Sequence, residues 1–96
     1  MHAVTRTYVG HGAMELCDLL EARKAEVEKV MRSVAGFHSY LFFRTEYGGI
    51  SVTVCKDKAG SDQTTLVAHD WVAKNAGALD VKEPVVSDGA VVLQFS

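Results

Sequence analysis

The sequence predicts an α+β fold: a four-stranded antiparallel sheet with two helices on one face. The hydrophobic period changes repeatedly along the 96 residues, from two for strands to about 3.6 for helices and back. Glycines mark two of the changes, with Gly36 between a helical stripe and a strand and Gly48-Gly49 between two strands. The resulting order of strand, helix, strand, strand, helix, strand is that of the ferredoxin-like split βαβ unit.

The first predicted strand covers residues 3–9, which are rich in β-branched and aromatic side chains. The first predicted helix covers residues 13–34, because apolar residues recur there every three or four positions. Gly36 is expected to end this helix, since glycine enters the left-handed backbone region without steric cost. The helical stripe consists of Ala13, Leu16, Leu20, Val27, Val30, Met31 and Val34.

A hairpin follows, with strands over residues 37–45 and 50–56 and a turn over 46–49. Apolar and small polar residues alternate in its second strand, so we expect the apolar side to face the helices. That side holds Phe37, Leu41, Phe43, Ile50, Val52 and Val54. The side facing away holds His38, Tyr40, Phe42, Arg44, Ser51, Thr53 and Cys55. A one-residue bulge would reverse the assignment for the first of the two strands.

The second predicted helix covers residues 62–76, with Ser61 or Asp62 as its cap and Gly77 at its end. Residues 84–86 form a short extended piece that could be a separate edge segment. A turn over residues 87–89 then leads into the last predicted strand, residues 90–95.

Composition predicts one cytoplasmic domain over residues 1–96, with no secretory leader and no apolar run that could span a membrane. The net charge of −2 provides no basic surface for nucleic acid. Cys17 and Cys55 are distant in sequence and are expected to be free thiols. No metal-ligand cluster, nucleophile–base pair or phosphate loop is visible, so no cofactor or metal is predicted.

The face of the sheet away from the helices is expected to carry Tyr8, Tyr40 and Phe42 among polar neighbours. Such a face is too apolar to remain in water. The sequence therefore predicts a homodimer that forms through this open face.

The chain resembles the dimeric α/β-barrel superfamily, which includes antibiotic-biosynthesis-type monooxygenases, haem-degrading monooxygenases and stress-responsive barrel proteins. The resemblance lies in the order of elements, in residues 34–40 and 50–54, and in Trp71 on the second helix. It implies a barrel closed between two subunits, with small molecules bound between the sheet and helices of each protomer. The Asn, Trp and His set of the haem-degrading members cannot be placed here. The paired histidines of quinol-type monooxygenases are absent, so the resemblance implies no catalytic residue and is strongest to members of unknown function.

One candidate site is a polar, partly aromatic patch on the open face. Its arginine could hold an anionic or phenolic ligand, or its members could simply form hydrogen bonds and ion pairs across the dimer interface. The patch consists of Arg6, Tyr8, His38, Tyr40 and Arg44.

A second candidate site is the cleft between the helices and the sheet. Trp71 is expected to pack in the core, or to wall a ligand. Arg23 interrupts the helical stripe and is expected to pair with an acid such as Glu26, or to contact an anion in the cleft. His69 and His11 could be surface residues, or could present an imidazole to the cleft.

Two classes of function remain open. The first is a small-molecule-binding or stress-associated module without chemistry of its own. The alternative is a cofactor-independent monooxygenase or isomerase that acts on a small aromatic or quinol-like substrate. Its base would be a histidine: His11, His38 or His69.

Overall fold

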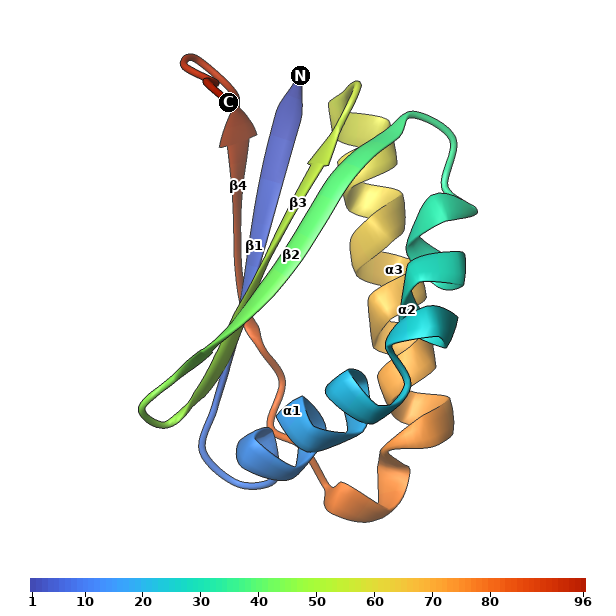
Figure 1. Ribbon diagram of the computed structural model, residues 1–96, viewed down its shortest axis with the longest axis vertical. Helices are drawn as coiled ribbons and strands as arrows, with labels where there is room; N and C mark the ends of the chain where they lie inside the picture. The colour runs from blue at the N-terminus through green and yellow to red at the C-terminus, as the bar shows by residue number, and fades with distance from the viewer.

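A computed structural model describes residues 1–96 as a sheet with all of its helices on one side (Figure 1). The sheet order is β2-β3-β1-β4, and every neighbouring pair is antiparallel. The predicted α+β fold and ferredoxin-like order are therefore confirmed. The elements are β1 (His2–Val9), α1 (Ala13–Ala22), α2 (Lys24–Arg32), β2 (Phe37–Thr45), β3 (Gly48–Cys55), α3 (Lys58–Asn75), the 3-10 helix η1 (Gly77–Leu79) and β4 (Val85–Ala90).

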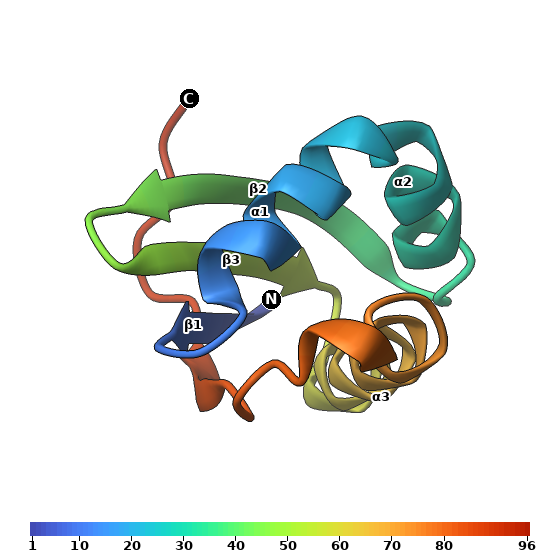
Figure 2. The ribbon, with the colours of Figure 1, turned by 90° about the horizontal axis from the view of Figure 1, so that it is seen from below.

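The first helical segment is broken into two helices, where the sequence predicted one. Arg23 leaves helical geometry at φ −115° and ψ 33°, although its backbone N–H still donates to Leu19. The break lets α1 pack on β1 and β3 while α2 turns to pack on β2 and α3 (Figure 2). The two halves of the apolar stripe therefore pack against different partners. Leu16 is buried in the α1 half, and Val27 and Met31 are buried in the α2 half.

Helix α3 begins at Lys58, four positions before the predicted start. Its cap is Asp57, whose carboxylate accepts a hydrogen bond from the backbone N–H of Gly60 at 2.9 Å, so the prediction of Ser61 or Asp62 was wrong. Gly60 and Ser61 lie inside the first turns, where they are buried. A Cβ at Gly60 would lie 3.3 Å from the Cβ of Cys55, so small residues are what bring α3 against the sheet here.

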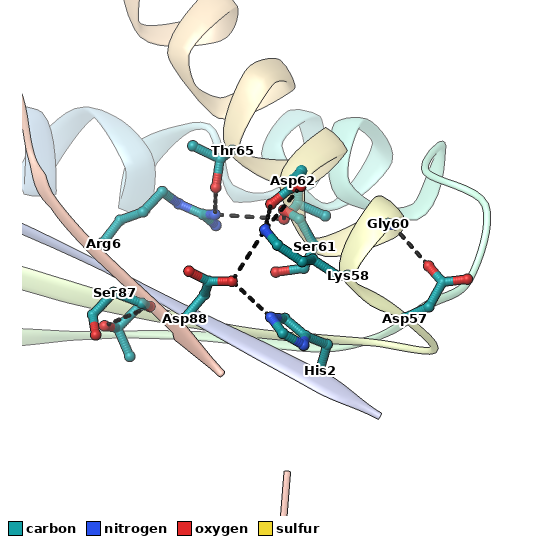
Figure 3. Close-up of polar contacts among 12 residues, drawn as sticks. His2, Arg6, Asp57, Lys58, Gly60, Ser61, Asp62, Thr65, Ser87 and Asp88 are labelled. Atoms are coloured by element: carbon teal, nitrogen blue, oxygen red, sulfur yellow. Dashed lines mark hydrogen bonds and ion pairs between the residues drawn. The ribbon is translucent and has the colours of Figure 1, made fainter. Parts of the chain in front are cut away.

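The last strand also differs from the prediction. Strand β4 is formed by Val85–Ala90, whereas residues 91–96 have no regular structure. The predicted turn lies within the strand because β1 offers an unpaired edge from His2 to Thr7, along which β4 pairs. Asp88 is held there by a hydrogen bond with His2 at 2.7 Å and an ion pair with Lys58 at 3.5 Å (Figure 3).

The prediction of which side of the sheet faces the helices was wrong. The helix side holds Val4, Arg6 and Tyr8 of β1, Tyr40 and Phe42 of β2, and Ser51, Thr53 and Cys55 of β3. The open side holds Leu41, Phe43, Ile50, Val52 and Val54. The pairing between β2 and β3 has the expected parity, with Phe42 opposite Ser51. A bulge at His38 returns Phe37 alone to the predicted side, opposite Cys55.

The physical reason for this reversal lies in Arg6. Alternation shows which residues share a face, but not which face the helices cover. Arg6 is only 2% exposed on the helix side, and a buried guanidinium needs polar partners. The hydroxyl side of β3 supplies one of them through Thr53, which leaves the apolar side of the same strand on the open face.

The core between the helices and the sheet is built around Tyr8, Leu16, Val27 and Trp71. These residues come from β1, α1, α2 and α3, so one strand and all three α-helices contribute to a single cluster. None of the helices combines the length and the apolar character that crossing a membrane requires.

Candidate functional site

Arg6 is a buried arginine held by hydroxyl groups alone. Its guanidinium donates hydrogen bonds to Thr53 at 2.6 Å, Thr65 at 3.0 Å and Thr64 at 3.5 Å. Figure 3 shows its side chain reaching from β1 toward Thr65 on α3. No carboxylate forms an ion pair with it, although every other arginine of the chain has one. The site therefore carries an uncompensated positive charge beneath the helices.

The two tyrosines beside Arg6 do not neutralise its positive charge. Burial lowers the pKa of Arg6, but its ordinary value is so high that it stays protonated at neutral pH. Burial raises the pKa of Tyr8, and raises the pKa of Tyr40 to about 12. Both phenols are thus neutral at neutral pH and able to donate hydrogen bonds.

Two neighbouring cavities meet at Arg6 and Tyr8. The outer cavity, of about 220 Å³, lies between α3, β4 and the segment that joins them. The inner one, of about 20 Å³, lies beneath α2 and α3. Both are lined by Arg6, Tyr8 and Val72, so these residues stand where the open and enclosed parts join.

Ser51 is a functional candidate that the sequence analysis missed. It is 1% exposed, its hydroxyl has no hydrogen-bond partner, and it lines the inner cavity. In the sheet it lies directly opposite Arg6 on one side and Phe42 on the other. The signal was the alternation of hydroxyl residues in β3, but this signal carries meaning only once that side is known to face the helices.

Trp71 belongs to a polar cluster that joins the α1–α2 break to α3. Its indole N–H donates to Glu26 at 2.9 Å, and Arg23 donates to the same carboxylate at 2.6 Å and 2.8 Å. Arg23 also lies over the indole ring, 5.4 Å from its centroid. The predicted pairing of Arg23 with Glu26 and the packing of Trp71 in the core are confirmed, and Trp71 forms a wall of the inner cavity.

The structure divides the predicted open-face patch. Arg6, Tyr8 and Tyr40 do gather, but beneath the helices rather than on the open face. Arg44 is on the helix side at the edge of the sheet, where it is exposed and paired with Asp18 at 2.8 Å and Glu21 at 3.1 Å. His38 is an exposed residue at the bulge of β2, apart from both cavities. The placement of Arg6, Tyr8, Tyr40 and Arg44 on the open face was therefore wrong.

The predicted cleft residues are also divided. His69 lines the outer cavity, where it is 58% exposed and its imidazole lies 3.6 Å from Glu83 and 3.8 Å from Asp70. His11 is exposed in the turn after β1 and lines neither cavity. No group of three or more histidine, cysteine, aspartate or glutamate side chains is arranged to hold a metal ion.

Comparison with known proteins identifies the fold. No protein-family model matches the chain, and no curated protein matches it. Among solved structures, a mutant of MhuD with manganese protoporphyrin IX bound matches with a TM-score of 0.69 at 18% identity, over 99% of this chain and 97% of that one.

Two other solved structures have a similar fold. A dimeric ferredoxin-like protein from an uncultured marine organism matches with a TM-score of 0.64 at 15% identity, over 99% of this chain and 95% of that one. A mutant of SnoaB, a cofactor-independent oxygenase from Streptomyces nogalater, matches with a TM-score of 0.52 at 16% identity, over 99% and 93%.

The resemblance to dimeric α/β-barrel proteins is thus confirmed at the level of the fold. Similar structures include a protein of unknown function from Nitrosomonas europaea as well as oxygenases. The fold therefore does not choose between a binding module and an enzyme, and the choice must come from the site itself.

Proposed function

We propose that residues 1–96 act as one domain that forms a homodimer and binds a small organic molecule between the helices and sheet of each protomer. The observation that carries this proposal is the convergence of Arg6 and Tyr8 at the junction of two cavities. A pure dimerisation module needs no such cavity. A binding site needs apolar walls with a few polar groups at one point, which this cleft provides.

The binding proposal is tested by native mass spectrometry of the untagged protein, as purified and after incubation with a set of small aromatic compounds. We expect a retained or added mass of a few hundred daltons per protomer. The Ala73→Trp variant places a bulky ring in the outer cavity and should lose this mass, because Ala73 lines that cavity. Ala59→Trp, on the same helix but away from the cavity, is the matched control. Binding that is absent, or equal in wild type and Ala73→Trp, would contradict the proposal.

The homodimer proposal rests on the open face of the sheet. Leu41 and Phe43 are 54% and 47% exposed, and they lie opposite Val52 and Ile50 of the adjacent strand. Val85 adds an apolar side chain at the far edge, opposite Thr7. This face is more apolar than the sequence analysis expected, so the argument for covering it is stronger. The dimeric ferredoxin-like neighbour supports the same assembly.

The assembly is tested by analytical ultracentrifugation. We expect Leu41→Lys to shift the protein to a monomer, because a charge would be buried against an apolar partner face. Leu66→Lys is the matched control, since Leu66 is 59% exposed but lies on α3. A dimer that survives Leu41→Lys and dissociates with Leu66→Lys would place the interface on the helices.

A cofactor-independent oxygenase is the second candidate, because His69 lines the same cavity as Arg6 and Tyr8. A histidine base would take the proton of a phenolic or quinol substrate, and Arg6 would stabilise the resulting anion for reaction with dioxygen. Similarity to the oxygenase SnoaB supports this candidate. Oxygen uptake with a panel of quinols tests it: turnover that is lost in His69→Phe and kept in His38→Phe would favour the enzyme.

The residues do not fit a haem, although one structural neighbour holds a porphyrin. His69 is exposed beside Glu83 and outside the enclosed part of the cleft. The phenols of Tyr8 and Tyr40 keep their protons because burial raises the pKa of each, which makes them poor ligands for iron. The outer cavity of about 220 Å³ also lies below the range of about 300–1,000 Å³ typical of drug-sized ligands.

A cytoplasmic location is part of the proposal. Cys17 and Cys55 are both buried free thiols, and such cysteines persist in a reducing compartment. Trapping the thiols with an alkylating reagent immediately on lysis, under denaturing conditions, tests whether both are reduced in the cell.

A further inference from the structure

We propose that the ligand is a small organic monoanion whose charged oxygen lies between the Arg6 guanidinium and the Ser51 hydroxyl, with its apolar body against the walls of the cleft. This inference rests on the proposed binding function and adds the chemical class of the ligand. It also assigns Ser51 to the site.

The first argument is charge balance. Buried charges in proteins are paired or bound to a counter-ion, because removing an ion from water is costly. Arg6 is 2% exposed and has only the hydroxyls of Thr53, Thr64 and Thr65 as partners. These groups orient the guanidinium but do not neutralise it. An anionic molecule that enters the cleft would supply the complementary charge.

The second argument is the unpaired hydroxyl of Ser51. A buried hydroxyl without a partner destabilises the folded state, so such groups are few in native proteins and each needs an explanation. Ser51 lies opposite Arg6 in the ladder and lines the same inner cavity. Ser61 also has an unpaired hydroxyl, but it lines neither cavity. The placement beside Arg6 is what distinguishes Ser51.

The third argument is that donors surround this point. Arg6 donates only, Ser51 has a free proton to give, and Tyr8 and Tyr40 line the inner cavity as neutral phenols. No carboxylate lines the inner cavity, whereas two exposed carboxylates line the outer one. A set of donors with a fixed positive charge selects an anionic oxygen and rejects an amine.

The walls and the volume of the cleft indicate the polarity and the size of the rest of the ligand. The inner cavity of about 20 Å³ has room for little more than the charged oxygen, so the body of the ligand lies in the outer cavity. Apolar side chains that line the outer cavity, among them Val72, Val81 and Val86, favour an organic body over an inorganic ion. The outer cavity of about 220 Å³ accommodates a single ring or a short chain. A small aryl carboxylate or phenolate combines these properties, and a second charge would have no buried partner.

The test uses benzoate and its neutral analogue benzamide as probes, with binding measured by isothermal titration calorimetry at constant ionic strength. We expect benzoate to bind at least about tenfold more tightly than benzamide, which corresponds to about 1.4 kcal/mol. The double variant Arg6→Met/Thr53→Val should abolish this preference. Arg32→Met is the control for loss of one positive charge, because Arg32 is exposed and paired with Glu28.

Ser51→Ala separates a ligand contact from a structural role. Removing an unpaired buried hydroxyl should leave the melting temperature unchanged or higher, while the affinity for benzoate falls about threefold to tenfold. A structural hydroxyl would instead lower the melting temperature and leave the affinity unchanged. That second result would remove Ser51 from the site.

The outcomes distinguish this inference from the broader proposal. Equal affinity for benzoate and benzamide, with binding lost in Ala73→Trp, would refute the anion while leaving the binding function intact. Sulfate that competes with benzoate at equal affinity would refute the organic part of the ligand. Failure of every small aromatic compound to bind would overturn both proposals.

Discussion

Substitution of Thr53 and Arg6 in a double-mutant cycle tests whether Arg6 is a binding residue or a structural one. Thr53 accepts the shortest hydrogen bond that Arg6 makes, at 2.6 Å, and is 0% exposed. Thr53→Val removes this acceptor while keeping the shape of the side chain. The guanidinium then remains buried with fewer partners, so the folded state should lose stability.

The magnitude follows from the contacts. A hydrogen bond to a charged group contributes about 1.5–3 kcal/mol, so Thr53→Val should destabilise wild type by about 2 kcal/mol. In a domain of 96 residues this lowers the melting temperature by roughly 8–16 °C. In the Arg6→Met background no cation remains, and Thr53→Val should be neutral or slightly stabilising. The expected coupling energy is therefore about 2–3 kcal/mol.

Replacing Arg6 is expected to change the folding stability in the direction opposite to that for a structural residue. Burial lowers the pKa of Arg6, so the protonated side chain costs stability in the folded state throughout the neutral pH range. Removing the charge together with the Thr53 hydroxyl should leave stability unchanged or raise it by about 1–2 kcal/mol, as apolar replacement of buried ion groups often does. Binding residues commonly have this property, because their groups are arranged for a ligand rather than for the fold.

The assay is urea denaturation of wild type, both single variants and the double variant, all at one protein concentration because dimerisation contributes to stability. Additivity within about 0.5 kcal/mol would show that the hydrogen bond between Arg6 and Thr53 carries no net energy. A double variant less stable than wild type by more than about 2 kcal/mol would refute the assignment of Arg6 to a binding site and make it part of the core.

Other predictions concern the framework of the site. Hydrogen bonds from Arg23 and Trp71 hold the pKa of Glu26 below its usual value of 4.5, so the stability that Glu26 adds is present above that pH and is lost as the pH falls. Glu26→Gln should therefore flatten the acid limb of a stability–pH profile, and an unchanged limb would contradict this. Gly48→Ala should destabilise by about 2–4 kcal/mol, because its Cβ would overlap the backbone carbonyl of Tyr8. Gly89→Ala, in a strand with open space around it, should stay within about 0.5 kcal/mol in the same melts.

Much of the fold followed from the sequence because it depends on local periodicity. The order of elements, strand β2 and the grouping of Arg6 with Tyr8 on one face are set by spacing along the chain. The break at Arg23 did not follow, because the apolar stripe continues on both sides of it and an arginine within such a stripe is compatible with a continuous helix. The break is decided by packing, because α1 and α2 contact different partners.

The same division holds for the site. The sequence by itself determined which side chains share a face of each strand, and so that Arg6, Tyr8 and Tyr40 would lie together. Only the tertiary structure decided that this face lies beneath the helices, that Thr53 and Ser51 meet Arg6 there, and that no carboxylate does. The physical reason is that alternation divides the side chains of a strand between two faces without indicating which face the helices cover. That choice depends on whether the buried charge finds polar partners and whether the apolar surfaces are both covered.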